Sequence, residues 1–99
     1  MKGTLVIIPT YNEIGNIDAI LRKVFSINED AHVLVVDDGS PDGTGDVVKK
    51  LQRSVFSERL HLIERQGKLG LGTAYITGFK FALQKGFEYV IEMDADFSH

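Results

Sequence analysis

The sequence predicts an α/β fold: a parallel sheet with strand order 3-2-1-4 and helices on both faces. Short, fully apolar runs alternate with segments whose apolar residues recur at helical spacing, and Gly-, Asp- or Pro-containing turns separate them. Continuous apolar strands separated by helices are typical of parallel sheets that are covered on both faces. Right-handed crossovers leave few topologies, and we expect the half-Rossmann order, in which the chain reverses direction between strands 1 and 4.

The first strand is predicted over the apolar run from Thr4 to Ile8, with Pro9 ending it. From Glu13 the apolar spacing changes and predicts a helix, with Asn12 as its N-cap and Glu13 in its first turn. The expected buried face of this helix consists of Ile14, Ile17, Ile20, Leu21, Val24 and Phe25.

The second strand is predicted over Val33–Val36, and a strong turn sequence, Asp37–Gly43, follows it. Thr44 is expected to cap a second helix. The predicted apolar face of that helix consists of Val47, Val48, Leu51 and Val55. A third strand, with a weaker pattern, is predicted over Leu60–Ile63.

A Gly-rich segment, Gly67–Gly72, leads into the third predicted helix, which Lys85 and Gly86 close with favourable C-terminal chemistry. The apolar residues assigned to this helix are Ile76, Phe79, Ala82 and Leu83. The fourth strand is predicted over Tyr89–Met93. The sequence as given ends soon afterwards, so residues 1–99 are expected to be one part of a longer catalytic domain, truncated after Asp96, or to have the outer edge of this strand covered by self-association.

The composition of the chain argues against several classes of function. The 43% hydrophobic and 25% charged content is typical of a folded globular domain. A net charge of −3, without a Lys/Arg run, argues against a nucleic-acid partner. The absence of cysteine excludes disulfides, zinc-thiolate sites and thiol nucleophiles, and it fits a reducing compartment such as the cytoplasm. No run approaches the ~18 apolar residues that would span a bilayer.

Polar residues gather after the predicted strand ends. In an open parallel sheet, ligands bind beyond the carboxyl ends of the strands, where the strand order reverses. Pro9–Glu13 follow the first strand, Asp37 and Asp38 the second, Gly67–Gly72 the third and Asp94–Asp96 the fourth. With the expected order, the first and fourth clusters face each other across a crevice, which predicts a binding site there.

Asp94 and Asp96 place two carboxylates on one side of an extended strand end. Both can face one cation, and oxygen ligands favour Mg²⁺ or Mn²⁺, which would bridge to the phosphates of a ligand. The alternative is a solvated acidic turn. The histidines show no metal-ligand spacing. His32 and His61 are expected to be structural or surface residues, whereas His99 is close in sequence to the two acids and its role is left open.

Asp37 and Asp38 end a hydrophobic strand, where a carboxylate can accept hydrogen bonds from a base or a ribose hydroxyl. The alternative is that Asp38, Ser40 and Asp42 cap the turn or the helix that follows. Tyr11 can stack on a base, and Glu13 can bind base or ribose or interact with a helix dipole. Thr10, from its position alone, is a turn residue.

The Gly-rich segment matches neither a Walker A loop nor a strict Gly-x-Gly-x-x-Gly pattern, because Leu69 follows Lys68 and Tyr75 stands at the last Gly position. It also follows the third strand rather than the first, which argues against a nicotinamide dehydrogenase. Its backbone N–H groups and the following helix N-terminus could still bind an anion, with Lys68 adding positive charge. The alternative is a flexible surface loop.

Four segments together resemble family 2 glycosyltransferases of the GT-A fold. They are Ile7–Glu13, Val35–Thr44, Gly67–Tyr75 and Met93–His99. The first and last are widespread in the family, whereas the Ser-Pro-Asp-Gly-Thr stretch and the Gly-Lys-Leu-Gly-Leu-Gly-Thr-Ala-Tyr block are narrower and resemble dolichol- or polyprenol-phosphate mannosyltransferases. The resemblance covers essentially all 99 residues and implies the Rossmann-like half of a GT-A fold.

The resemblance implies a role for each matching residue. Pro9, Tyr11 and Glu13 would contact the nucleotide, Asp38 and Asp37 would bind base or ribose, and Asp94 and Asp96 would be the catalytic and metal-binding residues. Thr10 and Lys68 complete the predicted nucleotide-binding set from their positions after the first and third strands. The two metal-binding acids would hold Mg²⁺ or Mn²⁺ against the donor diphosphate. Some relatives carry Gln where this chain has Ser98, so no third side-chain ligand is carried over.

The expected reaction is the inverting transfer of mannose from GDP-mannose to a polyprenyl phosphate, at the cytoplasmic face of a membrane. The acceptor phosphate is largely ionised at neutral pH, with a second pKa of about 6, so a strong general base is unnecessary. Two alternatives stay open: a nucleotide-binding fragment without turnover, and a family 2 glucosyl-phospholipid or polysaccharide glycosyltransferase that uses a UDP-sugar.

Overall fold

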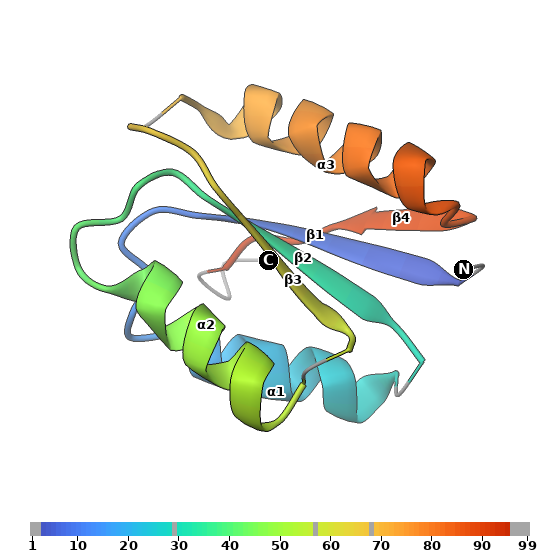
Figure 1. The fold of residues 1–99 in the computed structure, drawn as a ribbon, viewed down its shortest axis with the longest axis horizontal. Helices are drawn as coiled ribbons and strands as arrows, with labels where there is room; N and C mark the ends of the chain where they lie inside the picture. Colours follow the sequence, from blue (N-terminus) through green and yellow to red (C-terminus); the bar gives the residue numbers. More distant parts are fainter. Residues whose placement is uncertain (1–2, 29, 57, 68, 96–99) are drawn as a thin grey trace.

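The computed structural model describes residues 3–28, 30–56, 58–67 and 69–95. Within them, strands and helices alternate in the order β1 (Thr4–Thr10), α1 (Ile17–Ile27), β2 (His32–Asp37), α2 (Thr44–Ser54), β3 (Leu60–Glu64), α3 (Leu71–Lys85) and β4 (Tyr89–Glu92). The strands form one parallel sheet in the order β3-β2-β1-β4, with α1 and α2 on one face and α3 on the other (Figure 1). The predicted fold class, strand order and two-sided covering are confirmed.

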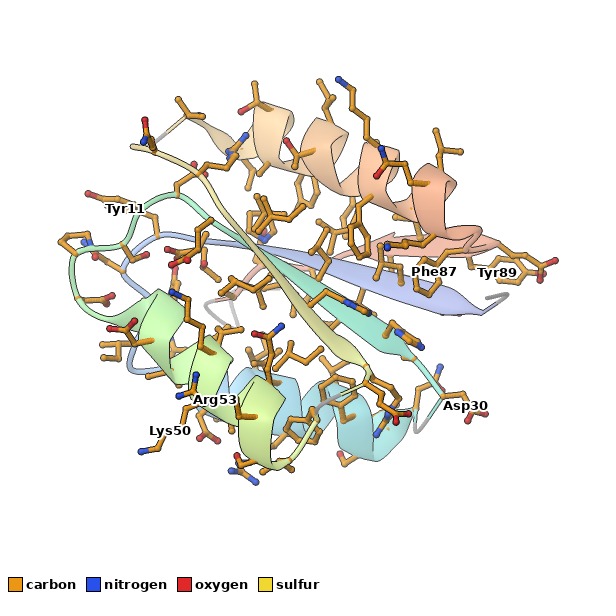
Figure 2. All side chains as sticks on the ribbon, viewed as in Figure 1. Tyr11, Asp30, Lys50, Arg53, Phe87 and Tyr89 are labelled. Carbon is orange, nitrogen blue, oxygen red and sulfur yellow. The ribbon has the colours of Figure 1, made fainter. Side chains whose placement is uncertain are left out.

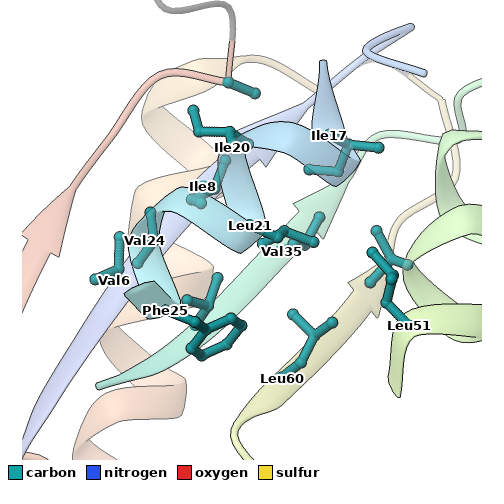
Figure 3. Packing of buried hydrophobic residues seen from close by; sticks show 13 residues of the cluster. Val6, Ile8, Ile17, Ile20, Leu21, Val24, Phe25, Val35, Leu51 and Leu60 are labelled. Atoms are coloured by element: carbon teal, nitrogen blue, oxygen red, sulfur yellow. The ribbon is translucent and has the colours of Figure 1, made fainter. Parts of the chain in front are cut away.

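The central strands bury side chains on both faces, as their continuous apolar runs predict. Because successive side chains of a strand point to opposite faces, β1 and β2 each feed two cores. The core under α1 and α2 takes Val6, Ile8, Val33 and Val35, and the core under α3 takes Leu5, Ile7, Leu34 and Val36. Figure 3 shows the first of these cores, where side chains of α1 pack over β1 and β2.

The first strand continues through Pro9 to Thr10, so the prediction that Pro9 ends it is wrong. The last β1–β4 pair is Ile7 with Glu92, whereas the β1–β2 pairing continues to Thr10 with Asp37. Pro9 therefore lies where β1 has a strand neighbour on one side only. At such a position the missing N–H removes no bond to a second neighbour.

Helix α1 begins at Ile17 with Asn16 at the N-cap, so the predicted start at Asn12 and Glu13 is wrong. Asn12 has a left-handed backbone, with φ of 56°. The backbone N–H groups of residues 12–14 are instead bound by side chains of the loop after β2: Asn12 by Ser40, Glu13 by Thr44 and Ile14 by Asp42. Ile14, predicted to lie on the buried face, is consequently 47% exposed.

Helix α2 follows Gly43, which has a left-handed φ of 95°, and Thr44 is its first residue rather than its cap. Val48 and Leu51 are buried as predicted, and Val47 packs at the margin of the same core. Val55, predicted on this face, lies at the C-cap and is half exposed. The helix ends at Ser54, so the helical periodicity that places Val48 and Leu51 on the sheet does not extend to Val55.

Helix α3 buries Ala74, Gly78 and Ala82, so the predicted apolar face is wrong except for Ala82. The reason is close packing on β1: a Cβ added at Gly78 would lie 2.5 Å from Cδ1 of Ile7. Small residues thus face the sheet and larger ones are turned outward, with Ile76 53% and Leu83 81% exposed. Gly86 closes the helix in a left-handed conformation, with φ of 78°, as predicted.

Strand β4 lies at one edge of the sheet, and its only strand partner among the described residues is β1. All of its residues, Tyr89–Glu92, are exposed. None of the helices in the described part of the chain is long and apolar enough to cross a membrane.

Candidate functional site

An open cleft of about 260 Å³ lies beyond the carboxyl ends of β1, β2 and β4, beside the start of α3. It is lined by Pro9, Thr10, Tyr11, Glu13, Asp38, Gly70, Leu71, Asp94 and Ala95. The location is the one that the reversal of strand order predicts for a ligand. Six of the residues singled out from the sequence, contributed by three separate segments, therefore share one cleft.

Tyr11 and Glu13 belong to the loop after β1, which is held in place by the loop after β2. The bonds from the backbone N–H groups of Asn12 and Glu13 to Ser40 Oγ and Thr44 Oγ1 measure 2.9 and 3.0 Å. Figure 2 shows Tyr11 projecting at the end of the sheet opposite Phe87 and Tyr89. Tyr11 is half-buried and lines the cleft, and an aromatic ring is a group that can stack on a planar ligand.

Asp37 is buried and does not line the cleft. Its carboxylate accepts a 2.6 Å hydrogen bond from Thr10 Oγ1, and the backbone N–H and hydroxyl of Ser40 donate to it at 3.0 and 2.6 Å. Asp37 thus caps the turn after β2, whereas the capping alternative named Asp38, Ser40 and Asp42. Asp37 fixes the ends of β1 and β2 relative to each other.

Asp38 lines the cleft with little exposed surface. Arg65 Nε donates to Asp38 Oδ1 at 2.7 Å, and the backbone N–H groups of Leu69 and Gly70 donate to Oδ2 at 3.0 and 3.3 Å. A carboxylate offers about four acceptor positions. Asp38 can therefore accept a further hydrogen bond from a ligand while it holds the loop after β3.

Asp94 stands at the opposite wall of the cleft, after β4. The backbone N–H of Met93 donates to the Ile7 carbonyl at 3.0 Å, which keeps this segment beside β1 beyond the last strand pair. Burial, followed by the carboxylates of Asp94 and Glu92, raises the pKa of the Tyr75 phenol. Asp94 therefore lies close enough to the Tyr75 side chain of α3 to affect its ionisation.

No group of three His, Cys, Asp or Glu residues that could hold a metal forms within the described segments. Of the two predicted metal ligands, Asp94 lies in the cleft, and Asp96 lies outside the described residues, as does the predicted anion-binding Lys68. A carboxylate oxygen is the ligand type that Mg²⁺ and Mn²⁺ prefer. The Asp94 carboxylate, which lines the cleft, is a ligand of the type that would bind such an ion.

Arg65 was not among the residues singled out from the sequence, although it follows the last residue of β3. The signal was present in principle, because residues just beyond a parallel strand's carboxyl end face the ligand region. Leu71 and Ala95 were also missed as lining residues, and neither carries a polar side chain that would mark it.

His32 and His61 lie at the other end of the sheet, away from the cleft. Their rings stack, with His32 Nδ1 2.9 Å from His61 Nε2, and they contact Phe87 and Phe81 respectively. This is a structural cluster, as expected. Burial lowers the pKa of both imidazoles; the Arg59 cation lowers that of His32 further, and His32 and Lys85 lower that of His61.

Comparisons with known proteins show which family and which relatives this chain resembles. Residues 5–99 match the family model described as glycosyl transferase family 2. Polyprenol monophosphomannose synthase of Mycolicibacterium smegmatis is 49% identical over 98 residues, which is 99% of this chain and 37% of that protein. Undecaprenyl-phosphate mannosyltransferase of Micrococcus luteus is 46% identical over 95 residues, or 96% of this chain and 38% of that protein. The chain thus spans less than two-fifths of the length of these curated relatives.

Two solved structures share the fold. The mannosyltransferase PcManGT from Pyrobaculum calidifontis, in complex with GDP-Man and Mn²⁺, superposes with a TM-score of 0.73 at 30% identity, covering 80% of this chain and 24% of that one. TarS 1-349 of S. aureus superposes with a TM-score of 0.77 at 28% identity, covering 95% of this chain and 27% of that one.

Proposed function

Because this chain belongs to glycosyl transferase family 2, we propose that it supplies the donor-nucleotide and metal site for transfer of mannose from GDP-mannose to a polyprenyl phosphate. Its sheet of order β3-β2-β1-β4 is the Rossmann-like half of the GT-A fold. The similarity to a polyprenol monophosphomannose synthase and an undecaprenyl-phosphate mannosyltransferase supports mannose and a polyprenyl acceptor. The similarity to the Pyrobaculum mannosyltransferase, solved with GDP-Man and Mn²⁺, supports GDP-mannose and a divalent cation.

One observation carries the proposal: residues from the ends of β1, β2 and β4 line a single cleft. Tyr11, Glu13 and Asp38 offer an aromatic ring and two carboxylates, which suit a base and a ribose. Asp94, on the β4 side, offers a carboxylate that would hold a divalent cation against the donor diphosphate. The nucleoside and the metal-bound diphosphate of a nucleotide sugar would thus each have suitable groups in the cleft.

Asp94 and Asp96 are the residues that would hold Mg²⁺ or Mn²⁺. A bound divalent cation neutralises negative charge on the leaving diphosphate. Asp94 lies in the cleft that would receive that diphosphate. The backbone of α3 begins beside the same cleft at Gly70 and Leu71, where a helix N-terminus favours an anion.

In the proposed reaction, an oxygen of the polyprenyl phosphate attacks C1 of the mannose. The bond between C1 and the diphosphate oxygen breaks, GDP leaves, and the configuration at C1 inverts. The acceptor oxygen is already largely ionised at neutral pH, so the chain's residues bind and orient the donor rather than remove a proton. Because the acceptor is a membrane lipid, the proposed place of the reaction is the cytoplasmic face of a membrane.

A second candidate is binding of the donor nucleotide without turnover. The described part of the chain lines the cleft with donor-side groups, and the chain matches little more than a third of the length of its curated relatives. Mannosyl transfer from labelled GDP-mannose to a polyprenyl phosphate by the 99-residue chain would refute this candidate.

Calorimetric titration of the 99-residue chain with GDP and with UDP, each in the presence of Mn²⁺, tests the donor assignment. The proposal expects GDP to bind at least about tenfold more tightly, a difference of about 1.4 kcal/mol. Preference for UDP would redirect the assignment to a UDP-sugar enzyme of the same family. Failure of both nucleotides to bind would remove the donor site altogether.

A further inference from the structure

Arg65 uses all three of its side-chain nitrogens on groups around the cleft. Nε donates to Asp38 Oδ1 at 2.7 Å, one terminal nitrogen donates to Thr73 Oγ1 at 3.0 Å, and the other donates to the Gly70 carbonyl at 3.1 Å. The Arg65 and Asp38 side chains are only 9% and 8% exposed. A largely buried guanidinium whose three nitrogens each donate a hydrogen bond is held in one orientation.

These contacts join three segments that the sequence keeps apart. Asp38 follows β2, Arg65 follows β3, and Gly70 immediately precedes α3. Asp38 reinforces the connection by accepting hydrogen bonds from the backbone N–H groups of Leu69 and Gly70. The backbone N–H of Arg65 donates to the Asp37 carbonyl at 2.8 Å, which fixes the start of the loop to the end of β2.

The segment held in this way forms one wall of the cleft. Gly70 and Leu71 line the cleft, while Arg65 and Thr73 stand behind them. Thr73 Oγ1 lies 3.0 Å from both the Leu69 and the Gly70 carbonyl oxygens and shares its single proton between them, so the same hydroxyl joins the loop to the first turn of α3. Gly70 has a positive φ of 103°, a conformation that glycine adopts without the steric cost of a Cβ.

We propose that Arg65 is the positioning residue of the cleft: it fixes the Asp38 carboxylate and the Gly70–Leu71 wall in the geometry that receives the donor nucleotide. The proposal rests on the proposed donor site for its ligand, but the positioning itself is a property of the ligand-free protein. Arginine suits this task because its planar fork reaches three acceptors in fixed directions, whereas lysine offers one point charge.

The test compares Arg65→Gln, Arg65→Lys and Arg59→Gln. Arg59 is a matched control because it precedes the other end of β3, where it contacts the Ala31 carbonyl and the Phe25 ring, far from the cleft. The first readout is hydrogen exchange at the backbone amides of Leu69 and Gly70 in the ligand-free proteins. The second is the affinity for GDP in the presence of Mn²⁺, with the melting temperature of each variant recorded.

Arg65→Gln is expected to speed amide exchange at both loop positions by about tenfold or more and to weaken GDP binding by a similar factor, as befits loss of a charge-assisted hydrogen bond. Arg65→Lys should keep the charge and recover only part of both effects. Arg59→Gln should leave loop exchange and GDP affinity at wild-type values even if it lowers the melting temperature.

The proposal would be overturned if Arg65→Gln kept the amide-exchange rates and the GDP affinity of the wild type. It would also be overturned if Arg59→Gln changed both quantities as much as Arg65→Gln does. If Arg65→Gln does not fold, Arg65→Lys alone is compared with the wild type and with Arg59→Gln, and wild-type loop exchange and GDP affinity in Arg65→Lys would then overturn the proposal. If the wild-type chain does not bind GDP, the donor assignment fails, and loop exchange alone then decides whether Arg65 positions the wall.

Discussion

Thr10 Oγ1 donates a 2.6 Å hydrogen bond to Asp37 Oδ1, and the two residues are buried register partners at the carboxyl ends of β1 and β2. Two strand ends that would otherwise diverge into loops are thereby joined directly behind the cleft. The loop after β1 carries Tyr11 and Glu13, and the loop after β2 carries Asp38. The bond therefore helps to set the distance between residues on different walls of the site.

Replacing Asp37 with Asn should lower the free energy of unfolding by about 1–3 kcal/mol, because Asn offers a single acceptor oxygen to three donors and directs an N–H₂ group at them. Urea denaturation measures the change. Thr10→Ser keeps the hydroxyl and should lose less than Thr10→Val. Equal stability of Asp37→Asn and the wild-type protein would show that the buried carboxylate contributes nothing to the fold.

The contact between Gly78 and Ile7 predicts an unfavourable effect of a single added methyl group. Gly78→Ala places a Cβ 2.5 Å from Ile7 Cδ1, and we expect a loss of about 1–3 kcal/mol despite the better helix propensity of Ala. Gly72→Ala is the matched control in the same helix, because its added Cβ meets nothing within 4 Å. Thermal unfolding measures the melting temperatures of the two variants. A melting temperature of Gly78→Ala equal to or above that of Gly72→Ala would contradict the close packing of α3 on β1.

The stacked pair of His32 and His61 predicts a loss of stability in mild acid. Burial lowers the pKa of each imidazole, so between the folded pKa and the ordinary value of about 6.5 the unfolded chain binds more protons. The contribution to stability is therefore complete above that ordinary value and is lost as the pH falls through the folded pKa. Urea midpoints at pH 7.5 and pH 5 should differ less in His61→Phe than in the wild type; an unchanged difference would contradict the assignment.

The exposed edge of β4 predicts self-association. Tyr89 and Met93 direct their N–H groups to β1, so strand alternation directs that of Val90 outward. Val90→Pro should reduce association, because it removes an outward donor and leaves the bonds to β1 in place, whereas Val90→Ala keeps that donor. Light scattering over a concentration series measures the effect. A monomeric wild-type protein at high concentration would contradict the prediction.

The sequence predicts the positions of the strands well because β1, β2 and β4 centre on short apolar runs, which can be recognised without knowledge of their neighbours; the pattern of β3 is weaker. The order of the parallel strands then places Tyr11, Glu13, Asp38 and Asp94 at one end of the sheet, where they line one cleft; their binding of a ligand stays a prediction. These successes rest on local pattern and on general topology.

The errors arise where distant residues decide the local structure. The N–H groups of residues 12–14 bind side chains 28 to 31 positions away, which delays the start of α1. The face of α3 is set by Ile7 pressing on Gly78, and a periodicity of large apolar residues does not reveal this contact. The position of Arg65 after β3 marks it as a residue of this end of the sheet, but its contact with Asp38, 27 positions earlier in the chain, cannot be predicted from a local pattern.

The central claim, a metal-dependent donor site in this cleft, is tested most directly by calorimetric titration of GDP into the wild type, Asp94→Asn and Asp46→Asn, with and without Mn²⁺. Asp46 is an exposed acid in the first turn of α2 and serves as the control. We predict that Mn²⁺ tightens GDP binding to the wild type and to Asp46→Asn by about tenfold or more, equal to about 1.4 kcal/mol, and that Asp94→Asn loses this gain. GDP binding that is indifferent to Mn²⁺ and unchanged in Asp94→Asn would contradict the claim.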